Sequence, residues 1–386
     1  MPILPPGFGK TMREALRLVR GQDPMAATRA IRAALTGAQT QDAAPQAGAR
    51  ATSAPRPRLG LDATLEVLRR GRLAPRVTPS DDAAPGEFLA GDYVGSAGTR
   101  AYRLYVPTRP AAPQDSRVVV MLHGCKQNAD DFAAGARMNA VCERRGWFAL
   151  YPEQTKVANL NRCWNWFLPA DQTAQRGEPA ILAAMTRQIM AERDIRHAAV
   201  AGLSAGAAMA LILADVHPEL FDAALAHSGV AVGAARDLRS ALAAMREGAE
   251  PVPARPFTPR VMIVQGMADE TVAPRNADVI EAAISGDDDR ARKTTAEEGG
   301  RKVERRERRD AQGRLAVLTL RVSDLGHAWS GGSSAGSFTD PKGPQASELF
   351  ARFIEGEAPR LARRDARRRG ARRGTSHRPV ADARCS

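Results

Sequence analysis

Val200–Gly206 reads VAGLSAG and places Ser204 between two glycines, directly after an apolar run. This G-x-S-x-G pattern is typical of a nucleophile elbow, in which a strand turns sharply into a helix and presents the serine hydroxyl at the edge of a sheet. A β-carbon at Gly202 or Gly206 would obstruct the close strand-helix packing of such a turn. The pentapeptide alone is weakly specific, because an ordinary Gly-Ser turn has the same composition. Its interpretation depends on the rest of the chain.

Apolar runs alternate with helical periodicity on both sides of this stretch. Strands are predicted at residues 101–107, 117–124, 148–151, 198–201, 223–226, 261–264 and 315–322. Helices are predicted at residues 129–144, 178–193, 205–216 and 275–284. This alternation is typical of a mainly parallel sheet with helices on both faces. We therefore predict an α/β fold with a doubly wound sheet, in a catalytic domain that spans residues 87–357.

The two ends of the chain differ from this domain in composition. Residues 1–36 carry helical periodicity with a break at Gly21–Pro24, which predicts a helical hairpin. Residues 37–86 are rich in Ala, Pro, Thr, Gln, Asp and Arg, so we expect a mostly disordered linker. Residues 358–386 combine many arginines with few apolar side chains and predict a disordered basic tail.

The net charge of +13 over 386 residues invites the interpretation that the protein binds nucleic acid. Much of the excess lies in the basic tail, however, and the block Arg301–Arg309 is interrupted by acids, as a solvated face is. No recognition motif or interleaved aromatic residues accompany the charge. A specific nucleic-acid partner is therefore not expected, although a basic arm can bind polyanions.

Cysteine usage and hydropathy exclude several further classes. The four cysteines are too few for a disulfide scaffold, and their spacing matches no zinc site, so no metal or cofactor is predicted. No apolar run approaches the roughly 20 residues that span a bilayer. The start, Met1–Pro6, lacks a basic region followed by an apolar segment, so the sequence as written predicts no secretory signal.

Ser204 needs two partners to act as a nucleophile. A hydroxyl needs a base, and the base needs a carboxylate that holds its tautomer. Asp269 follows the predicted strand at 261–264, and His327 follows the one at 315–322. The order serine, acid, histidine, each beyond a strand, is the order found in enzymes with this elbow. The three positions together are far more specific than the elbow alone.

Each partner has a competitor. His227 also follows a strand, but it precedes the acid and so breaks the chain order. Glu270 and Asp278 are the alternatives to Asp269, which is favoured by its position directly beyond the strand.

Acyl transfer also needs N–H donors for the oxyanion that forms on the attacked carbonyl. The residue after the nucleophile, Ala205, supplies one backbone N–H, and the loop after the strand at 117–124 supplies the other at Cys125. In this interpretation Cys125 acts through its amide. The alternative, a nucleophilic Cys125 thiol, has no partner residue to support it.

With these residues in place, the chain resembles the poly(3-hydroxybutyrate) depolymerase family of α/β-hydrolase esterases over about residues 86–353. The stretches that carry the resemblance are GTRAYRLYVP at 98–107, LHGCKQ at 122–127, YPEQ at 151–154, NRCWNWF at 161–167, GLSAG at 202–206 and GHAWSGG at 326–332. NRCWNWF is hard to obtain by chance. The resemblance implies an α/β-hydrolase fold and a serine esterase that hydrolyses hydroxyalkanoate esters through an acyl-enzyme.

Two other functions remain as alternatives. The family lies close to feruloyl and acetylxylan esterases, so a carbohydrate esterase would use the same machinery. A polyanion-binding protein on a hydrolase fold is the less favoured interpretation. Family members are commonly extracellular, and those that degrade polymer carry an additional binding domain. No aromatic-rich module follows Phe353, so we expect short oligomers or small esters as substrates.

The resemblance also implies roles for aromatic and cysteine side chains. The aromatic residues expected to line an apolar groove for the substrate are Trp164, Trp166, Phe167 and Trp329. The less favoured alternative is that two of them simply pack beneath the loop. Cys125 and Cys163 recur as a pair in resembling proteins, which implies proximity and suggests a disulfide. A disulfide would fit an oxidising compartment.

Overall fold

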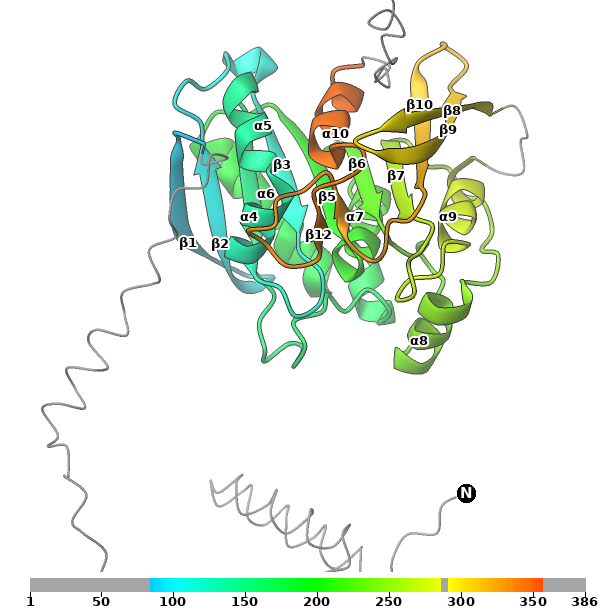
Figure 1. Cartoon of the computed structure of the whole chain (residues 1–386). Helices are drawn as coiled ribbons and strands as arrows, with labels where there is room; N and C mark the ends of the chain where they lie inside the picture. Colours follow the sequence, from blue (N-terminus) through cyan, green and yellow to red (C-terminus); the bar gives the residue numbers. More distant parts are fainter. Residues whose placement is uncertain (1–83, 286–290, 357–386) are drawn as a thin grey trace, which may run out of the picture. The chain divides into compact units, whose positions relative to one another are not determined.

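The computed structural model describes residues 84–285 and 291–356, and only these are considered below (Figure 1). The predicted hairpin at 1–36, the linker up to residue 83 and the basic tail at 358–386 lie outside the described residues.

A mixed sheet of ten strands forms the centre of the described region, in the order β1-β2-β4-β3-β5-β6-β7-β10-β9-β8. The parallel strands in the middle are β4 (Phe148–Pro152), β3 (Arg117–Leu122), β5 (His197–Leu203), β6 (Phe221–His227), β7 (Arg260–Gly266) and β10 (Leu315–Val322). Antiparallel strands flank them, namely β1 (Glu87–Gly95) and β2 (Gly98–Val106) on one side, and β9 (Arg301–Arg309) and β8 (Arg292–Glu298) on the other. The predicted α/β fold with a mainly parallel sheet is confirmed.

Helices cover both faces of this sheet (Figure 1). One face packs against α6 (Gly177–Glu192), α7 (Ala205–Val216), α8 (Leu238–Glu247) and α9 (Asn276–Ser285), and the other against α4 (Ala129–Ala136), α5 (Met138–Arg145) and α10 (Ala346–Ile354). In β3, Val118 and Val120 enter the first core and Val119 and Met121 the second, because side chains alternate along a strand. Burial on both faces explains why the central strands read as continuous apolar runs.

Strands β1 and β8 and helices α8 and α10 have no counterpart among the predicted elements. Two further segments differ from what the sequence predicted for them. The helix expected over 129–144 is divided into α4 and α5 at Arg137, whose φ of 60° ends the first helix. The block Arg301–Arg309, expected to be a solvated face, is strand β9. Val303 is fully buried there, and Arg305, only 4% exposed, pairs with Glu307. The side chains on one face of β9, Val303 and Arg305 among them, are therefore buried although the strand is rich in charged residues.

A small second sheet lies near the carboxyl ends of the central strands. It pairs β11 (Trp329–Ser330) with β12 (Thr339–Asp340) and so closes the loop between them. Separately, none of the described helices combines the length and apolar character needed to cross a bilayer.

Candidate active site

Ser204 occupies the turn between a strand and a helix. β5 ends at Leu203 and α7 begins at Ala205, so one residue makes the connection. Its φ of 59° and ψ of −120° are sparsely populated for a residue with a side chain. A β-carbon on Gly202 would collide with the backbone of Gly206, and one on Gly206 with the carbonyl of Leu122. The sequence therefore needs both glycines to form the elbow.

Asp269 and His327 form a hydrogen-bonded pair in the loops beyond β7 and β10. His327 Nδ1 lies 2.8 Å from Asp269 Oδ2, and Asp269 Oδ1 accepts the N–H groups of Thr271 at 2.9 Å and Val272 at 2.8 Å. Burial raises the pKa of Asp269, but the hydrogen bonds from His327 and the two amides outweigh burial and leave it below the ordinary value. The ionised carboxylate holds the proton on Nδ1 and leaves Nε2 available as an acceptor.

Sheet topology brings the serine and this pair to the same edge. β5, β6, β7 and β10 are adjacent and parallel, so their carboxyl ends meet there. The described residues contain no hydrogen bond between the Ser204 hydroxyl and His327. Catalytic contacts of this kind often shorten only when substrate is bound.

The alternative acids are placed differently. Asp278 is bound to Arg306 and Arg321 on β9 and β10, and Glu270 is exposed. Of the three carboxylates, only Asp269 contacts His327 in the described structure.

His227, the alternative base, instead supports the site from within the core. Its ring is fully buried and stacks on Trp329 with centroids 5.1 Å apart. Nε2 accepts the N–H of Ser330 at 3.0 Å, and the backbone carbonyl accepts the N–H of Ser204 at 2.9 Å. His227 thus connects the nucleophile elbow to the loop that carries His327. Its place at the end of a predicted strand indicated a residue near the site. The sequence did not indicate that it would connect the two loops.

The two amides expected to bind the oxyanion lie beside the serine. Neither the Cys125 N–H nor the Ala205 N–H has a hydrogen-bond partner within the described part of the chain. Ala205 starts α7, where backbone N–H groups point away from the helix. The loop after β3 passes close to Ser204, since a β-carbon on Gly124 would lie 3.6 Å from Ser204 Cβ. Since neither amide has a competing partner among the described residues, their role as oxyanion donors stays a prediction that this part of the structure allows.

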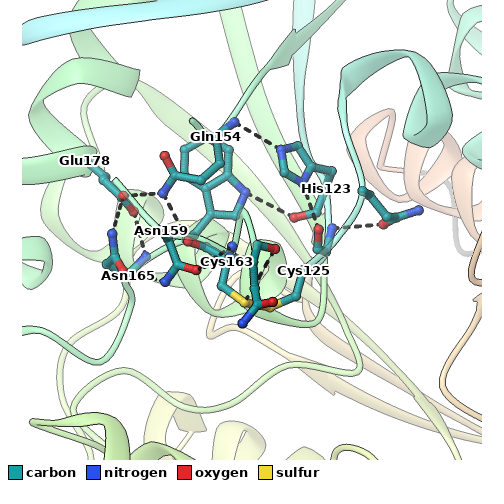
Figure 2. The surroundings of a disulfide bond; sticks show 11 residues. His123, Cys125, Gln154, Asn159, Cys163, Asn165 and Glu178 are labelled. Atoms are coloured by element: carbon teal, nitrogen blue, oxygen red, sulfur yellow. Dashed lines mark hydrogen bonds between the residues drawn. A yellow bond between two sulfur atoms is a disulfide. The ribbon is translucent and has the colours of Figure 1, made fainter. Parts of the chain in front are cut away.

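Hydrogen bonds among buried polar groups hold the loop that leads to Cys125 (Figure 2). His123 Nδ1 donates to the Gly124 carbonyl at 2.8 Å, and Nε2 accepts the N–H of Gln154 at 3.1 Å. The indole of Trp164 donates to the His123 carbonyl at 3.0 Å. These contacts fix both the tautomer of His123 and the path of the chain that leads to Cys125.

A disulfide joins Cys125 to Cys163 and so ties the loop after β3 to the loop after β4 (Figure 2). Gln154 Nε2 donates to the Cys163 carbonyl at 3.1 Å and also to Glu178. Glu178 is 4% exposed and accepts the backbone N–H of Asn165 at 2.7 Å. Both ends of the disulfide are therefore anchored by buried hydrogen bonds.

A sequence model of the family described as "Esterase PHB depolymerase" matches residues 100–305, which is more than half of the chain. The chain belongs to this family. It is 32% identical over 179 residues to poly(3-hydroxyalkanoate) depolymerase C of Paucimonas lemoignei, covering 42% of this chain and 43% of that protein. It is also 32% identical over 134 residues to feruloyl esterase B of Neurospora crassa, covering 33% and 43%. The chain thus spans less than half of the length of these two relatives.

Among solved structures, the acetyl xylan esterase from Aspergillus awamori matches with a TM-score of 0.52 at 20% identity, covering 63% of this chain and 94% of that one. This likeness shows that the chain has the α/β-hydrolase fold.

Two of the four aromatic residues expected to line a substrate groove, Trp164 and Trp329, do not face solvent. Trp164 and Trp329 are fully buried, the first against His123 and the second between His227 and Phe132, so the expectation that they face substrate is wrong. Their indoles fill the core beneath the two loops instead. Trp166 is 4% exposed and packs edge-on against half-buried Phe167.

The exposed aromatic ring at the site belongs to a residue that the sequence analysis missed. Phe338 is 43% exposed, and its ring centroid lies 6.4 Å from that of His327. It follows a stretch of Ser, Gly and Ala at 332–337, which gives no periodic signal from the sequence. No cluster of His, Cys, Asp or Glu suited to a metal ion occurs among residues 84–285 and 291–356.

Removing the disulfide should weaken both stability and activity. The bond links residues 38 positions apart, and a loop of that size predicts a loss of about 4 kcal/mol in the free energy of unfolding for the double variant Cys125→Ser/Cys163→Ser. We expect kcat to fall as well, because the Cys125 amide loses its anchor. Tm and ester hydrolysis, with and without dithiothreitol, measure both effects. The double variant is the control, since reductant should no longer change its Tm; equal Tm values for variant and wild type would contradict the prediction.

The two buried histidines predict acid sensitivity of the fold. Burial lowers the pKa of His123 to about 4, and burial together with the charge of His327 lowers that of His227 to about 3. Unfolded histidines bind a proton near pH 6.5 and the folded rings do not, so the free energy of unfolding should fall as pH drops below about 6.5. With both rings contributing, the slope approaches about 2.7 kcal/mol per pH unit.

Urea unfolding at pH 7, 6 and 5 measures this slope. Glu178, whose pKa is raised by burial, opposes it near the acid end of the range. His227→Phe keeps a flat ring against Trp329 and should roughly halve the slope, at the cost of about 1–3 kcal/mol for the unpaired Ser330 N–H. Stability independent of pH between 7 and 5 would show that the folded rings take up protons normally.

Proposed function

We propose that this chain is a serine carboxylic-ester hydrolase in which Ser204 is the nucleophile, His327 the general base and Asp269 the group that orients and stabilises the histidine. The observation that carries the proposal is the elbow conformation of Ser204 at the sheet edge where Asp269 and His327 are paired at 2.8 Å. Membership of the family described as "Esterase PHB depolymerase" supports it independently.

The reaction follows from the positions of the donors and acceptors. His327 Nε2 removes the proton of Ser204 as Oγ attacks the ester carbonyl, and the backbone N–H groups of Ala205 and Cys125 bind the resulting oxyanion. His327 then gives the proton to the departing alcohol, leaving an acyl-enzyme. Water, deprotonated by the same Nε2, releases the acid and restores Ser204.

For the substrate we propose hydroxyalkanoate esters, and short oligomers in particular. The similarity to poly(3-hydroxyalkanoate) depolymerase C supports this class. The equal identity to feruloyl esterase B, over a shorter alignment, favours a carbohydrate-linked aromatic ester as the second candidate.

Two measurements test the proposal. A fluorophosphonate probe should label wild-type protein and fail to label Ser204→Ala. Values of kcat/KM for 3-hydroxybutyrate oligomers, methyl ferulate and acetylated xylan then rank the substrate classes. A protein that only binds polyanions would give neither labelling nor hydrolysis, and preferential cleavage of methyl ferulate would replace the hydroxyalkanoate proposal with the second candidate.

A further inference from the structure

Phe338 presents an uncovered aromatic ring beside the proposed base. The ring is edge-on to His327, at an interplanar angle of 76° and a centroid distance of 6.4 Å, and 43% of the residue is exposed. A single exposed apolar residue is common on protein surfaces and by itself needs no explanation. The backbone of Phe338 adds a second, independent observation.

Phe338 has a φ of 51°, in the left-handed region that bulky side chains rarely adopt. Glycine would take this conformation without strain. Strained residues persist where their surroundings hold them, and they gather at ligand-binding and catalytic sites. Because the ring is exposed, packing in the core does little to offset the strain of this conformation. We therefore look for the role of the ring in a contact with a molecule that arrives from solvent.

Hydrogen bonds fix the loop that carries this ring. The N–H of Trp329 donates to the Phe338 carbonyl at 2.8 Å, where β11 pairs with β12. The N–H of Ser337 donates to Asp131 Oδ1 at 2.8 Å, next to the start of α4. The backbone that carries the ring is therefore held in place before substrate arrives, which lowers the entropic cost of a contact with the ring.

Gln127 connects this loop to the proposed oxyanion site. Its Nε2 donates to the Ser337 carbonyl at 2.9 Å, and its Oε1 accepts the N–H of Gly124 at 2.9 Å. One buried side chain thus sets the position of the Phe338 loop relative to the loop of Cys125.

We propose that Phe338 forms the apolar wall of the subsite that receives the alcohol portion of the ester. This inference rests on the proposed function. His327 must reach the oxygen of the departing alcohol to protonate it, so a ring that packs beside His327 adjoins the alcohol rather than the acyl group. The preferred alcohols are aliphatic ones with several carbons, which bury their methylene groups against the ring.

Two ester series separate this subsite from the acyl side. Alkyl acetates from methyl to hexyl vary only the alcohol, and ethyl esters from acetate to hexanoate vary only the acyl group. In wild type, kcat/KM should rise with alcohol length by up to about fourfold for each methylene that contacts the ring. Phe338→Ala should flatten the alkyl acetate series, with a loss of about tenfold for butyl relative to methyl acetate, and leave the slope of the ethyl ester series unchanged.

Further variants distinguish binding from a structural role. Phe338→Gly should lose the alcohol preference while keeping or raising Tm, because glycine removes the backbone strain; Phe338→Leu should retain part of the preference. The loss should appear mainly in KM, and the pH profile of kcat should stay unchanged, whereas a ring that only positions His327 would shift that profile. Leu160→Ala, at an 87% exposed position, is the control and should alter neither series.

Three outcomes overturn the inference: an unchanged alkyl acetate slope in Phe338→Gly, an equal loss in both series, or a shifted pH profile. If wild type hydrolyses none of these esters, the proposed function itself fails, and this result is distinct from the other three.

Discussion

Ser204→Ala is expected to lower kcat for ester hydrolysis by about a millionfold, the size of the loss seen when a serine nucleophile is removed. In the proposed reaction the Ser204 hydroxyl forms the covalent bond to the acyl group, and no other residue in the described structure occupies the turn between β5 and α7. The fold should remain, because the backbone N–H of residue 204 still donates to the carbonyl of His227. Hydrolysis of p-nitrophenyl esters, with circular dichroism as the check on folding, measures both properties.

Ser204→Gly provides a matched control for this prediction. The serine backbone has a φ of 59°, which glycine adopts without strain, so this variant should be as inactive as Ser204→Ala and more stable by about 1 kcal/mol. Activity and stability would then move in opposite directions at one position. An alanine variant with more than one per cent of wild-type kcat would contradict the assignment of the nucleophile.

Asp269→Asn should lower kcat by about ten thousandfold. Two backbone N–H groups, those of Thr271 and Val272, donate to Asp269 Oδ1, so the asparagine carbonyl must occupy that place and its amino group must face His327. An amino group cannot accept the proton of Nδ1. The imidazole would therefore carry its proton on Nε2, where it cannot act as a base towards Ser204.

Glu270→Gln is the control variant. Glu270 is exposed and follows Asp269 in the sequence, and its substitution should leave kcat within twofold of wild type. Measuring kcat for both variants at pH 7, with Tm as the check on folding, decides the question. If Asp269→Asn retained activity within tenfold of wild type, another group would have to hold the histidine.

The sequence predicts the parts of this site that follow directly from chain order. Ser204, Asp269 and His327 each lie a few residues beyond a strand, and parallel strands place their carboxyl ends at one edge. The central strands are also predictable, because burial on both faces requires long apolar runs. Strand β9, which lies between β10 and the edge strand β8, was missed, because its arginines and glutamates conceal the alternation that places Val303 and Arg305 in the interior.

Side-chain roles that depend on packing were not predictable. Trp164 and Trp329 lie within two positions of site residues in the sequence, yet both indoles are buried. They fill the space in the core beneath their loops. His227 has the sequence position of a base, but only the structure shows its ring bound to the N–H of Ser330. Phe338 lies in a loop without periodicity, beside His327. Hydrogen bonds between the backbone of Ser337 and the side chains of Gln127 and Asp131, more than 200 positions away in sequence, hold this loop.

The position of His227 has a consequence for protein engineering. Its carbonyl binds the Ser204 amide and its ring binds the amide of Ser330, three residues beyond His327. A designer who exchanges the segment around His327 for that of another hydrolase would thereby also change what restrains the serine. Such chimaeras should therefore take His227 and Trp329 from the same parent enzyme, so that the stacked pair is kept.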